Sequence, residues 1–107
     1  MEVQDDVAGL RERVYRLMAE LPAGAVTTYG DLAAMAGSPR AARIVGGIAH
    51  TGPTDLPWHR LVNVHGGLAV GFPGGQEVQR QLLEQEGIAC DEQWRVAEFK
   101  ERRWRPM

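Results

Sequence analysis

The stretch that decides the fold runs from residue 28 to residue 50 and reads Thr28-Tyr-Gly-Asp31-Leu-Ala-Ala-Met-Ala-Gly37-Ser-Pro-Arg40-Ala-Ala-Arg43-Ile-Val-Gly-Gly47-Ile-Ala-His50. Thr28 followed by Asp31 predicts a capping box that opens a short helix, and Gly37 predicts its end. Ser38-Pro39 is typical of a new helix start, and this second helix would run from about Arg40 to His50. Two short helices joined by a tight glycine-containing turn predict a helix-turn-helix, although unrelated proteins also contain such pairs.

The flanking segments predict a mainly helical domain with a small β-hairpin wing. Apolar residues at helical spacing indicate a helix before the pair, with Val7, Leu10, Val14, Leu17, Met18 and Leu21 on its inner face. The runs 60–64 and 68–70, with glycines between them, predict the hairpin. A last helix is expected from about Gln76 to Glu86. No repeat or linker divides residues 1–107, so we expect one domain of the winged helix-turn-helix class.

Charge and composition restrict the possible functions. The chain has 107 residues, a net charge of −2 and a single lysine, Lys100, among its 12 basic residues. Arginines outnumber acids between residues 37 and 75 and again between 95 and 105. Arginine's planar fork suits phosphate and base contacts, so these segments indicate a nucleic-acid partner, with a solvated charged tail as the alternative.

Several other classes lack support in the sequence. No run of eighteen apolar residues predicts a membrane span, and the acidic N-terminus does not resemble a secretory signal, so we expect a cytoplasmic protein, nucleoid-associated if bacterial. The lone Cys90 precedes Asp91-Glu92, which would raise the pKa of its thiol and leave it inert. His50, His59 and His65 have spacings of nine and six, which fit no metal motif. We therefore expect neither a metal nor a cofactor.

Five pieces of the sequence, in order, carry a resemblance to a known family. They are residues 24–33, 36–47, 57–62, 67–75 and 82–87. Over about residues 10 to 88 the chain resembles the DNA-binding, active-site domain of the O6-alkylguanine-DNA alkyltransferases. The family motif Pro-Cys-His-Arg is replaced here by Pro57-Trp58-His59-Arg60. Without a thiolate this position cannot accept an alkyl group. The combination looks like the non-enzymatic alkyltransferase-like proteins, which implies binding of alkylated DNA and transfer of the lesion to nucleotide excision repair.

The resemblance implies which residues meet DNA. Arg43 matches the arginine that enters the duplex and fills the space left by a flipped nucleotide, and a phosphate clamp is the alternative reading. Tyr29 matches the tyrosine that crowds the target phosphate, and a buried core tyrosine is its alternative. The remaining members of the expected DNA-facing set are Arg40, Ala41, Ala42, Gly46 and Gly47. Their small side chains would let the helix approach the minor groove closely.

The resemblance also implies a lesion pocket built from Tyr29, Trp58, His59, Val62 and Phe72. Trp58 would offer an apolar surface to the extruded base, and its indole N–H needs a partner; a core tryptophan is the alternative. His59 and Glu86 match the pair that activates the cysteine in the enzymes, and here they would form a supporting hydrogen-bond network with Arg60 as a structural residue. Phe72-Pro73 removes hydroxyl groups from the pocket loop, and Gln79 stands where a lysine is often found.

Two competing functions stay open at this point. One is a winged-helix transcription regulator that binds a specific DNA sequence, which would need more base-reading side chains than the second helix offers. The other is an alkyltransferase that uses Cys90. The main hypothesis is a monomer that binds double-stranded DNA containing O6-alkylguanine, with excision-repair proteins as partners and no membrane. The Arg-rich extension 89–107 would strengthen DNA binding or widen the pocket rim.

Overall fold

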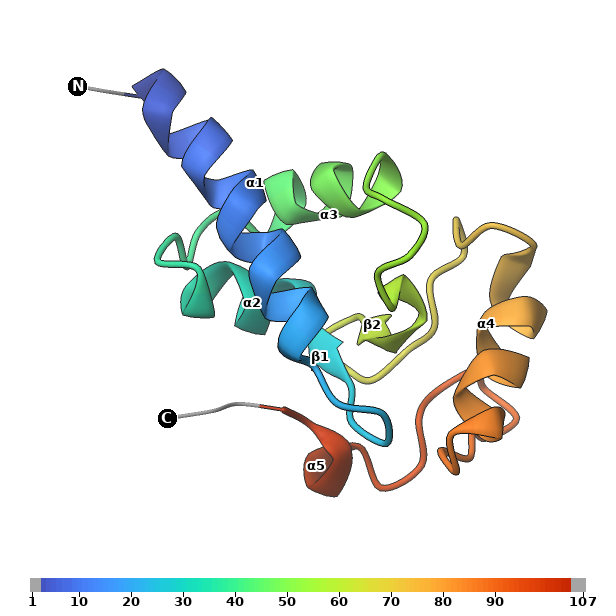
Figure 1. Cartoon of the computed structure of the whole chain (residues 1–107). Coiled ribbons are helices and arrows are strands. Elements are labelled where there is room, and N and C mark those ends of the chain that lie inside the picture. Colours follow the sequence, from blue (N-terminus) through green and yellow to red (C-terminus); the bar gives the residue numbers. More distant parts are fainter. Residues whose placement is uncertain (1–2, 105–107) are drawn as a thin grey trace.

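The computed structural model describes residues 3–104, with the backbone alone for residues 3–7. Helices dominate it, as the sequence predicts, and the strands are two residues long (Figure 1). In chain order the elements are α1 (Val3–Glu20), β1 (Thr27–Thr28), α2 (Tyr29–Met35), α3 (Ala42–His50), the 3-10 turn η1 (Trp58–Arg60), β2 (Leu61–Val62), α4 (Gly75–Gln85) and α5 (Phe99–Arg102). None of the helices in this described part is long and apolar enough to cross a membrane.

The helix pair α2 and α3 forms with one change from the expected boundaries. The hydroxyl of Thr28 accepts a hydrogen bond from the N–H of Asp31 at 2.9 Å, so the predicted cap is confirmed. The prediction that Ser38 caps the next helix is wrong, because α3 begins only after Ala41. The N–H of Ser38 donates to the carbonyl of Ala33 at 2.9 Å and so helps to close α2. Residues 38–41 form a turn instead of a first helical turn.

The predicted hairpin wing is wrong in its pairing. β2 lies parallel to β1, with Thr27 opposite Leu61 and Thr28 opposite Val62. After β2 the side chain of Asn63 accepts from the N–H groups of His65 and Gly67, both at 2.8 Å, which closes a tight turn. The segment that follows pairs with the C-terminal part of the chain, since the N–H of Leu68 donates to the carbonyl of Trp94 at 2.8 Å. One local bond across the bend remains, from the N–H of Asn63 to the carbonyl of Gly67 at 2.9 Å, and beyond it long-range partners replace the predicted hairpin.

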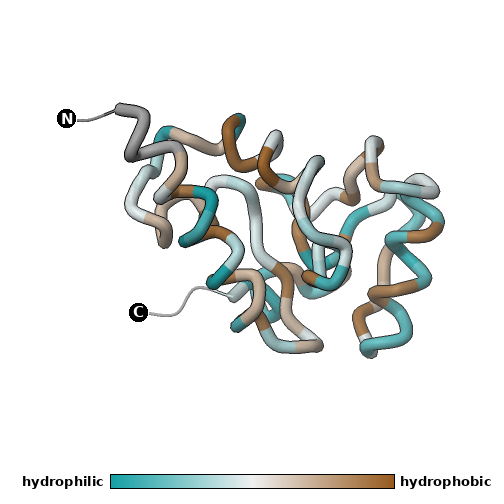
Figure 2. The backbone as a smooth tube through the Cα atoms, turned by 45° about the horizontal axis from the view of Figure 1, so that its top comes forward, coloured by the Kyte–Doolittle hydropathy of each residue, from teal (hydrophilic) through white to brown (hydrophobic). Residues whose placement is uncertain are grey.

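Two hydrophobic clusters form the core, and β2 lies between them. The first joins α1, α2 and α3 and consists of Leu10, Val14, Met18, Leu21, Leu32, Ala33, Ala36, Ala41, Val45, Ile48 and Leu61. The second underlies α4 and consists of Val26, Val62, Leu68, Leu83, Ile88 and Val96. Leu61 and Val62 belong to different clusters because successive strand residues point to opposite faces. In Figure 2 the turns of α4, at the right, alternate between hydrophilic and hydrophobic colours, as an amphipathic helix requires.

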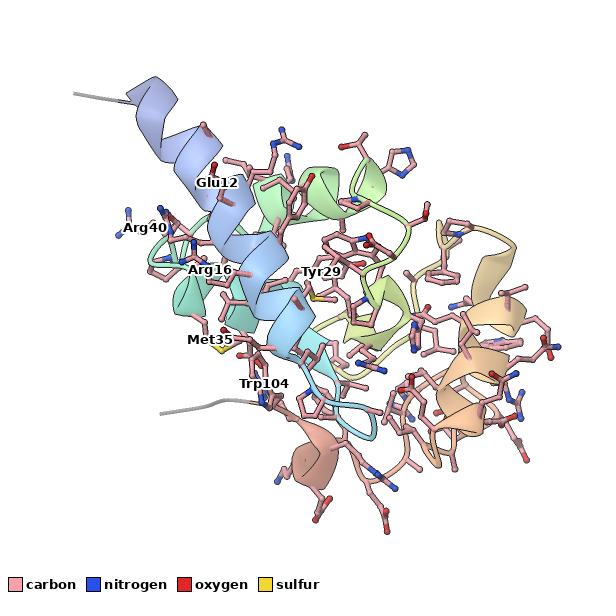
Figure 3. The ribbon with its side chains drawn as sticks, viewed as in Figure 1. Glu12, Arg16, Tyr29, Met35, Arg40 and Trp104 are labelled. Carbon is pink, nitrogen blue, oxygen red and sulfur yellow. The ribbon has the colours of Figure 1, made fainter. Side chains whose placement is uncertain are left out.

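The arginine-rich C-terminal segment is part of the fold. Residues 102–104 run beside β1, where the N–H of Val26 donates to the carbonyl of Arg102 and the N–H of Trp104 donates to the carbonyl of Val26. Trp104 packs against the first cluster, close to Met35 in Figure 3. The guanidinium of Arg102 donates to the carbonyls of Gly24 and Gly87 at 3.1 and 2.9 Å. Arg105, the last arginine of the range 95–105, lies outside the described residues.

Candidate nucleic-acid interface

The outer face of α3 is exposed and positively charged. The exposed positions of the helix are Arg43, Ile44, Gly47 and His50, and the exposed Arg40 lies in the turn just before it. The opposite face is fixed in the core by Val45 and Ile48. No acidic residue occupies the first turn, and Arg40 points away from the body of the protein in Figure 3. This face therefore offers two guanidinium groups and a glycine to a polyanion.

Not all the small residues of this helix lie on that face. Ala41 is only 9% exposed and packs in the first cluster, which contradicts its expected position against DNA. It shares a helix face with Val45 and Ile48, and those two residues are buried. Ala42 and Gly46 are half-buried at the edge of the exposed face. A Cβ on Gly46 would lie 4.0 Å from the ring of Tyr29, an ordinary contact.

A cavity of about 520 Å³ opens beside this helix face. It is surrounded by α2, α3, the loop after α3, the segment η1–β2, the loop before α4 and Leu82 of α4 itself. The lining residues include Tyr29, Gly46, His50, Gly52, Thr54, Leu56, Trp58, His59, Leu61, Ala69, Phe72 and Pro73. Tyr29, Trp58, His59 and Phe72, predicted to share a pocket, are thus brought together. Val62 is not among them, because it is fully buried in the second cluster and its neighbour Leu61 faces the cavity instead.

Trp58 is held in the cavity wall by three kinds of contact. Its indole N–H donates to the carbonyl of Pro53 at 2.7 Å, which supplies the partner that the sequence analysis required. Its ring meets Tyr15 edge to face at a centroid distance of 6.2 Å and an interplanar angle of 72°. It also covers Gly52, where a Cβ would lie 2.4 Å from Cζ2 of the indole. The ring plane is therefore fixed, with one part left to the cavity.

His59, Arg60 and Glu86 form the supporting network that the sequence predicts. Nε2 of His59 lies 2.8 Å from Oε2 of Glu86, and Nε and Nη2 of Arg60 donate to the same carboxylate at 2.9 and 2.7 Å. Nη1 of Arg60 donates to the carbonyl of Leu21 at 2.7 Å and so ties the network to the end of α1. Burial of the carboxylate opposes its ionisation, but the hydrogen bonds from Arg60 and His59 outweigh it and hold the pKa of Glu86 below its usual value.

Two further titratable side chains bear on the chemistry. Burial raises the pKa of the Tyr29 hydroxyl, so this group stays a neutral hydrogen-bond donor at physiological pH. Burial, with the nearby carboxylates of Glu84 and Asp91, raises the pKa of the Cys90 thiol despite the opposing effect of Arg80. Cys90 does not line the cavity. The described residues contain no cluster of three or more histidine, cysteine or acidic side chains suited to a metal ion.

Sequence reasoning missed the part played by Gln79. This side chain is fully buried, and it bonds to the backbone of His59, Leu61 and Ala69. A signal existed in its position four residues before the buried Leu83, which places both on the inner face of α4. A polar residue on such a face requires internal hydrogen-bond partners.

A helix pair with an arginine-bearing outer face, set beside an apolar cavity with a Pro-x-His-Arg wall, defines a DNA-binding domain of the alkyltransferase type. The family model described as "6-O-methylguanine DNA methyltransferase, DNA binding domain" matches residues 9–88. The chain belongs to this family.

Named relatives and a solved structure agree with this assignment. The "DNA base-flipping protein" of Escherichia coli K12 is 52% identical over 79 residues, which are 72% of this chain and 60% of that protein, so the match spans less than two thirds of the relative's length. "Alkyltransferase-like protein 1" of Schizosaccharomyces pombe is 37% identical over 101 residues, 88% of this chain and 93% of that protein. A crystal structure of S. pombe Atl1, in complex with damaged DNA containing O6-carboxymethylguanine, superposes with a TM-score of 0.79 at 28% identity, over 99% of this chain and all of that one.

Proposed function

We propose that this protein binds DNA containing O6-alkylguanine, rotates the damaged base into the cavity and holds it there without taking up the alkyl group. The observation that carries the proposal is the position of Trp58, fixed in the wall of an apolar cavity that opens beside the exposed arginine face of α3. The base-flipping name of the E. coli relative and the O6-carboxymethylguanine duplex bound by S. pombe Atl1 support it.

The exposed face of α3 performs the first steps. Arg43 enters the duplex in place of the extruded nucleotide, since a planar cation recovers part of the few kcal/mol lost in unstacking and unpairing. Arg40 contacts phosphate, and Ala42, Gly46 and Gly47 leave room for the helix backbone in the minor groove. Ala41 contributes only indirectly, by packing the N-terminal end of α3 into the core.

The cavity receives the base. Tyr29 lies beside Gly46 at the boundary between α3 and the cavity, where its ring crowds the phosphate of the target nucleotide. The rings of Trp58 and Phe72 offer apolar surface to the base and its alkyl group. His59 is oriented by Glu86, and Arg60 fixes that carboxylate from the other side. Alkyl transfer needs a thiolate, and Trp58 has none to offer.

Such a protein acts through its long-lived complex with lesion DNA and makes no chemical product. We infer that the bound monomer and its distorted DNA are recognised by nucleotide excision repair proteins, and that the protein works in the cytoplasm, on the nucleoid if it is bacterial. Pull-down of excision-repair proteins with a lesion duplex, in the presence and absence of the protein, tests this step. Equal recovery of excision-repair proteins in both samples would show that the complex does not recruit them.

The central experiment compares two duplexes that differ only in one O6-methylguanine. Fluorescence anisotropy gives the affinity for each duplex at a fixed salt concentration, and intact-mass analysis after incubation detects an adduct. We expect tighter binding to the lesion duplex and an unchanged protein mass. Equal affinities would refute lesion recognition, and a dependence on sequence alone would favour the transcription-regulator alternative. A mass gain of one methyl group would refute the absence of transfer.

Arg43→Ala and Arg40→Ala separate insertion into the duplex from phosphate contact. Arg40→Ala should weaken binding to both duplexes by the same factor and reduce the salt dependence, as loss of one phosphate contact does. Arg43→Ala should weaken binding to the lesion duplex about tenfold more than binding to the undamaged one, because only the flipped state needs the inserted side chain. An equal loss on both duplexes would assign Arg43 to a phosphate instead.

A further inference from the structure

The buried side-chain amide of Gln79 connects two walls of the cavity, namely the segment Trp58–Leu61 and the loop that begins at Ala69. Gln79 in α4 is fully buried, and each polar atom of its side chain is paired. Nε2 donates to the carbonyls of His59 and Leu61 at 3.0 and 3.1 Å. Oε1 accepts from the N–H of Ala69 at 2.7 Å. The amide therefore joins the Trp58–Leu61 segment to the loop that begins at Ala69.

These two segments have little other connection through secondary structure. β2 pairs with β1, and the segment 68–70 forms no strand beside β2. A neighbouring side chain strengthens the attachment of the loop, because Nε2 of Gln76 donates to the carbonyl of Leu68 at 3.0 Å. Two glutamines of α4, three residues apart on one helix face, thus hold the start of the loop, and Gln79 alone reaches both walls.

The loop that begins at Ala69 carries Phe72 and Pro73, and all three line the cavity together with His59 and Leu61. We propose that Gln79 is a positioning residue that fixes the spacing between these walls and thereby determines which O6-alkyl groups fit beside the base. This inference rests on the proposed function, since it concerns the cavity that receives the base. It adds a determinant of alkyl-group selectivity that never touches the DNA, because the amide is buried behind both walls.

Loss of the amide has a specific expected consequence. The loop detaches from the His59–Leu61 side, so a small lesion loses contact with one wall while a bulky lesion still reaches both. The affinity for small alkyl groups should therefore fall relative to the affinity for bulky ones. Binding to undamaged DNA depends on the exposed face of α3, which Gln79 does not contact, and should stay unchanged.

Gln79→Met tests this expectation, since methionine has nearly the same length and lacks both the donor and the acceptor. Gln81→Met is the matched control, because Gln81 is an exposed residue of the same helix. Affinities are measured for three duplexes that carry guanine, O6-methylguanine or O6-benzylguanine at one position. We expect Gln79→Met to reduce the methyl-to-benzyl affinity ratio about fivefold, as the loss of a wall contact would. The guanine duplex and the Gln81→Met control should behave as wild type.

Gln79→Lys provides a second route if the methionine variant does not fold. A lysine ammonium can donate to the carbonyls of His59 and Leu61 but cannot accept from the N–H of Ala69, so it cuts only the link to the loop. The methyl-to-benzyl ratio should fall in this variant as well. An unchanged ratio in either folded variant would overturn the proposal.

Amide hydrogen exchange in the DNA-free protein keeps the test independent of the proposed function. Residues 69–72 should exchange faster in the Gln79 variants than in wild type, while α3 should not. Unaltered exchange of this loop would show that Gln79 does not position it. The proposed function, in contrast, would be refuted if wild type bound neither lesion duplex more tightly than the guanine duplex, whatever the exchange result.

Discussion

The guanidinium of Arg103 holds both carboxylate oxygens of Asp31, at 2.6 and 2.9 Å, across 72 residues of chain. Asp31 lies in the first turn of α2, whose N-terminal residue is Tyr29. The same guanidinium lies 5.4 Å from the ring centroid of Phe99. Arginines that composition alone would assign to DNA therefore fasten the C-terminal segment to the helix pair. Two of the described cations of this segment, Arg102 and Arg103, have structural partners that leave little of either guanidinium for a phosphate.

Replacing Arg103 by alanine should lower the free energy of unfolding by about 1–2 kcal/mol, because a bidentate, mostly buried ion pair is lost. Urea unfolding monitored by circular dichroism measures this change. Lys100→Ala, at an exposed position of α5, should leave the unfolding midpoint within error. Equal midpoints for the Arg103 variant and wild type would show that the C-terminal segment does not stabilise the helix pair.

Glu86 should make the protein sensitive to acid. The folded-state pKa of its carboxyl is below the usual value, so its ionised form stabilises the fold above about pH 4.5 and this contribution is lost as the pH falls through the lower, folded value. Glu86→Gln should be less stable than wild type at pH 7, by about 1–2 kcal/mol for the weakened contacts with Arg60 and His59. The difference should shrink as the pH falls toward 3. Urea midpoints at four pH values test this, and parallel curves for the two proteins would contradict it.

Gly52 should control the orientation of Trp58. A Cβ at this position would lie 2.4 Å from the indole, so Gly52→Ala must displace the ring or the turn that carries the Pro53 carbonyl. We expect a loss of about tenfold in affinity for an O6-methylguanine duplex, since the displaced ring no longer faces the base squarely. Gly71→Ala adds the same methyl group to the same cavity in open space and should bind nearly as wild type. Equal behaviour of the two variants would mean that the indole plane does not matter.

The Pro57–Arg60 motif and Glu86 could be placed together from the sequence because their resemblance to a known family covers both. The observed distance of 2.8 Å between His59 and Glu86 agrees with that prediction. Tyr29, Trp58 and Phe72 also share the cavity as expected. Leu61 lines the cavity where Val62 was predicted to do so. This shows the limit of the prediction, because neighbouring strand residues point to opposite faces of the strand. Their roles on DNA remain predictions.

The errors in the fold predicted from the sequence have a common cause. The wing was predicted from local turn residues, but β2 finds its partner in β1, and the segment after Gly67 finds its own near Trp94. The C-terminal segment is held by arginine contacts with residues 72 and 78 positions earlier in the chain, and such contacts leave no periodic pattern in the sequence. The role of Gln79 likewise could not be predicted, because it depends on which backbone groups lie near its side chain in the folded protein. Local patterns predict the helices and the Thr28 cap, whereas tertiary hydrogen bonds decide between alternatives of similar local stability.

Gly47 should limit how closely α3 approaches DNA. It is exposed, and a Cβ on it would meet no atom of the protein within 4 Å, so the free protein tolerates a larger residue. Gly47→Leu should raise the free energy of unfolding by roughly 0.5–1 kcal/mol, because leucine is the better helix former. It should nevertheless weaken binding to lesion and undamaged duplexes alike, by about tenfold or more, since the side chain holds the helix away from the minor groove. Gln81→Leu, on the exposed side of α4, should leave both affinities unchanged. Retained affinity in a stabilised Gly47→Leu variant would place the DNA on another face of the protein.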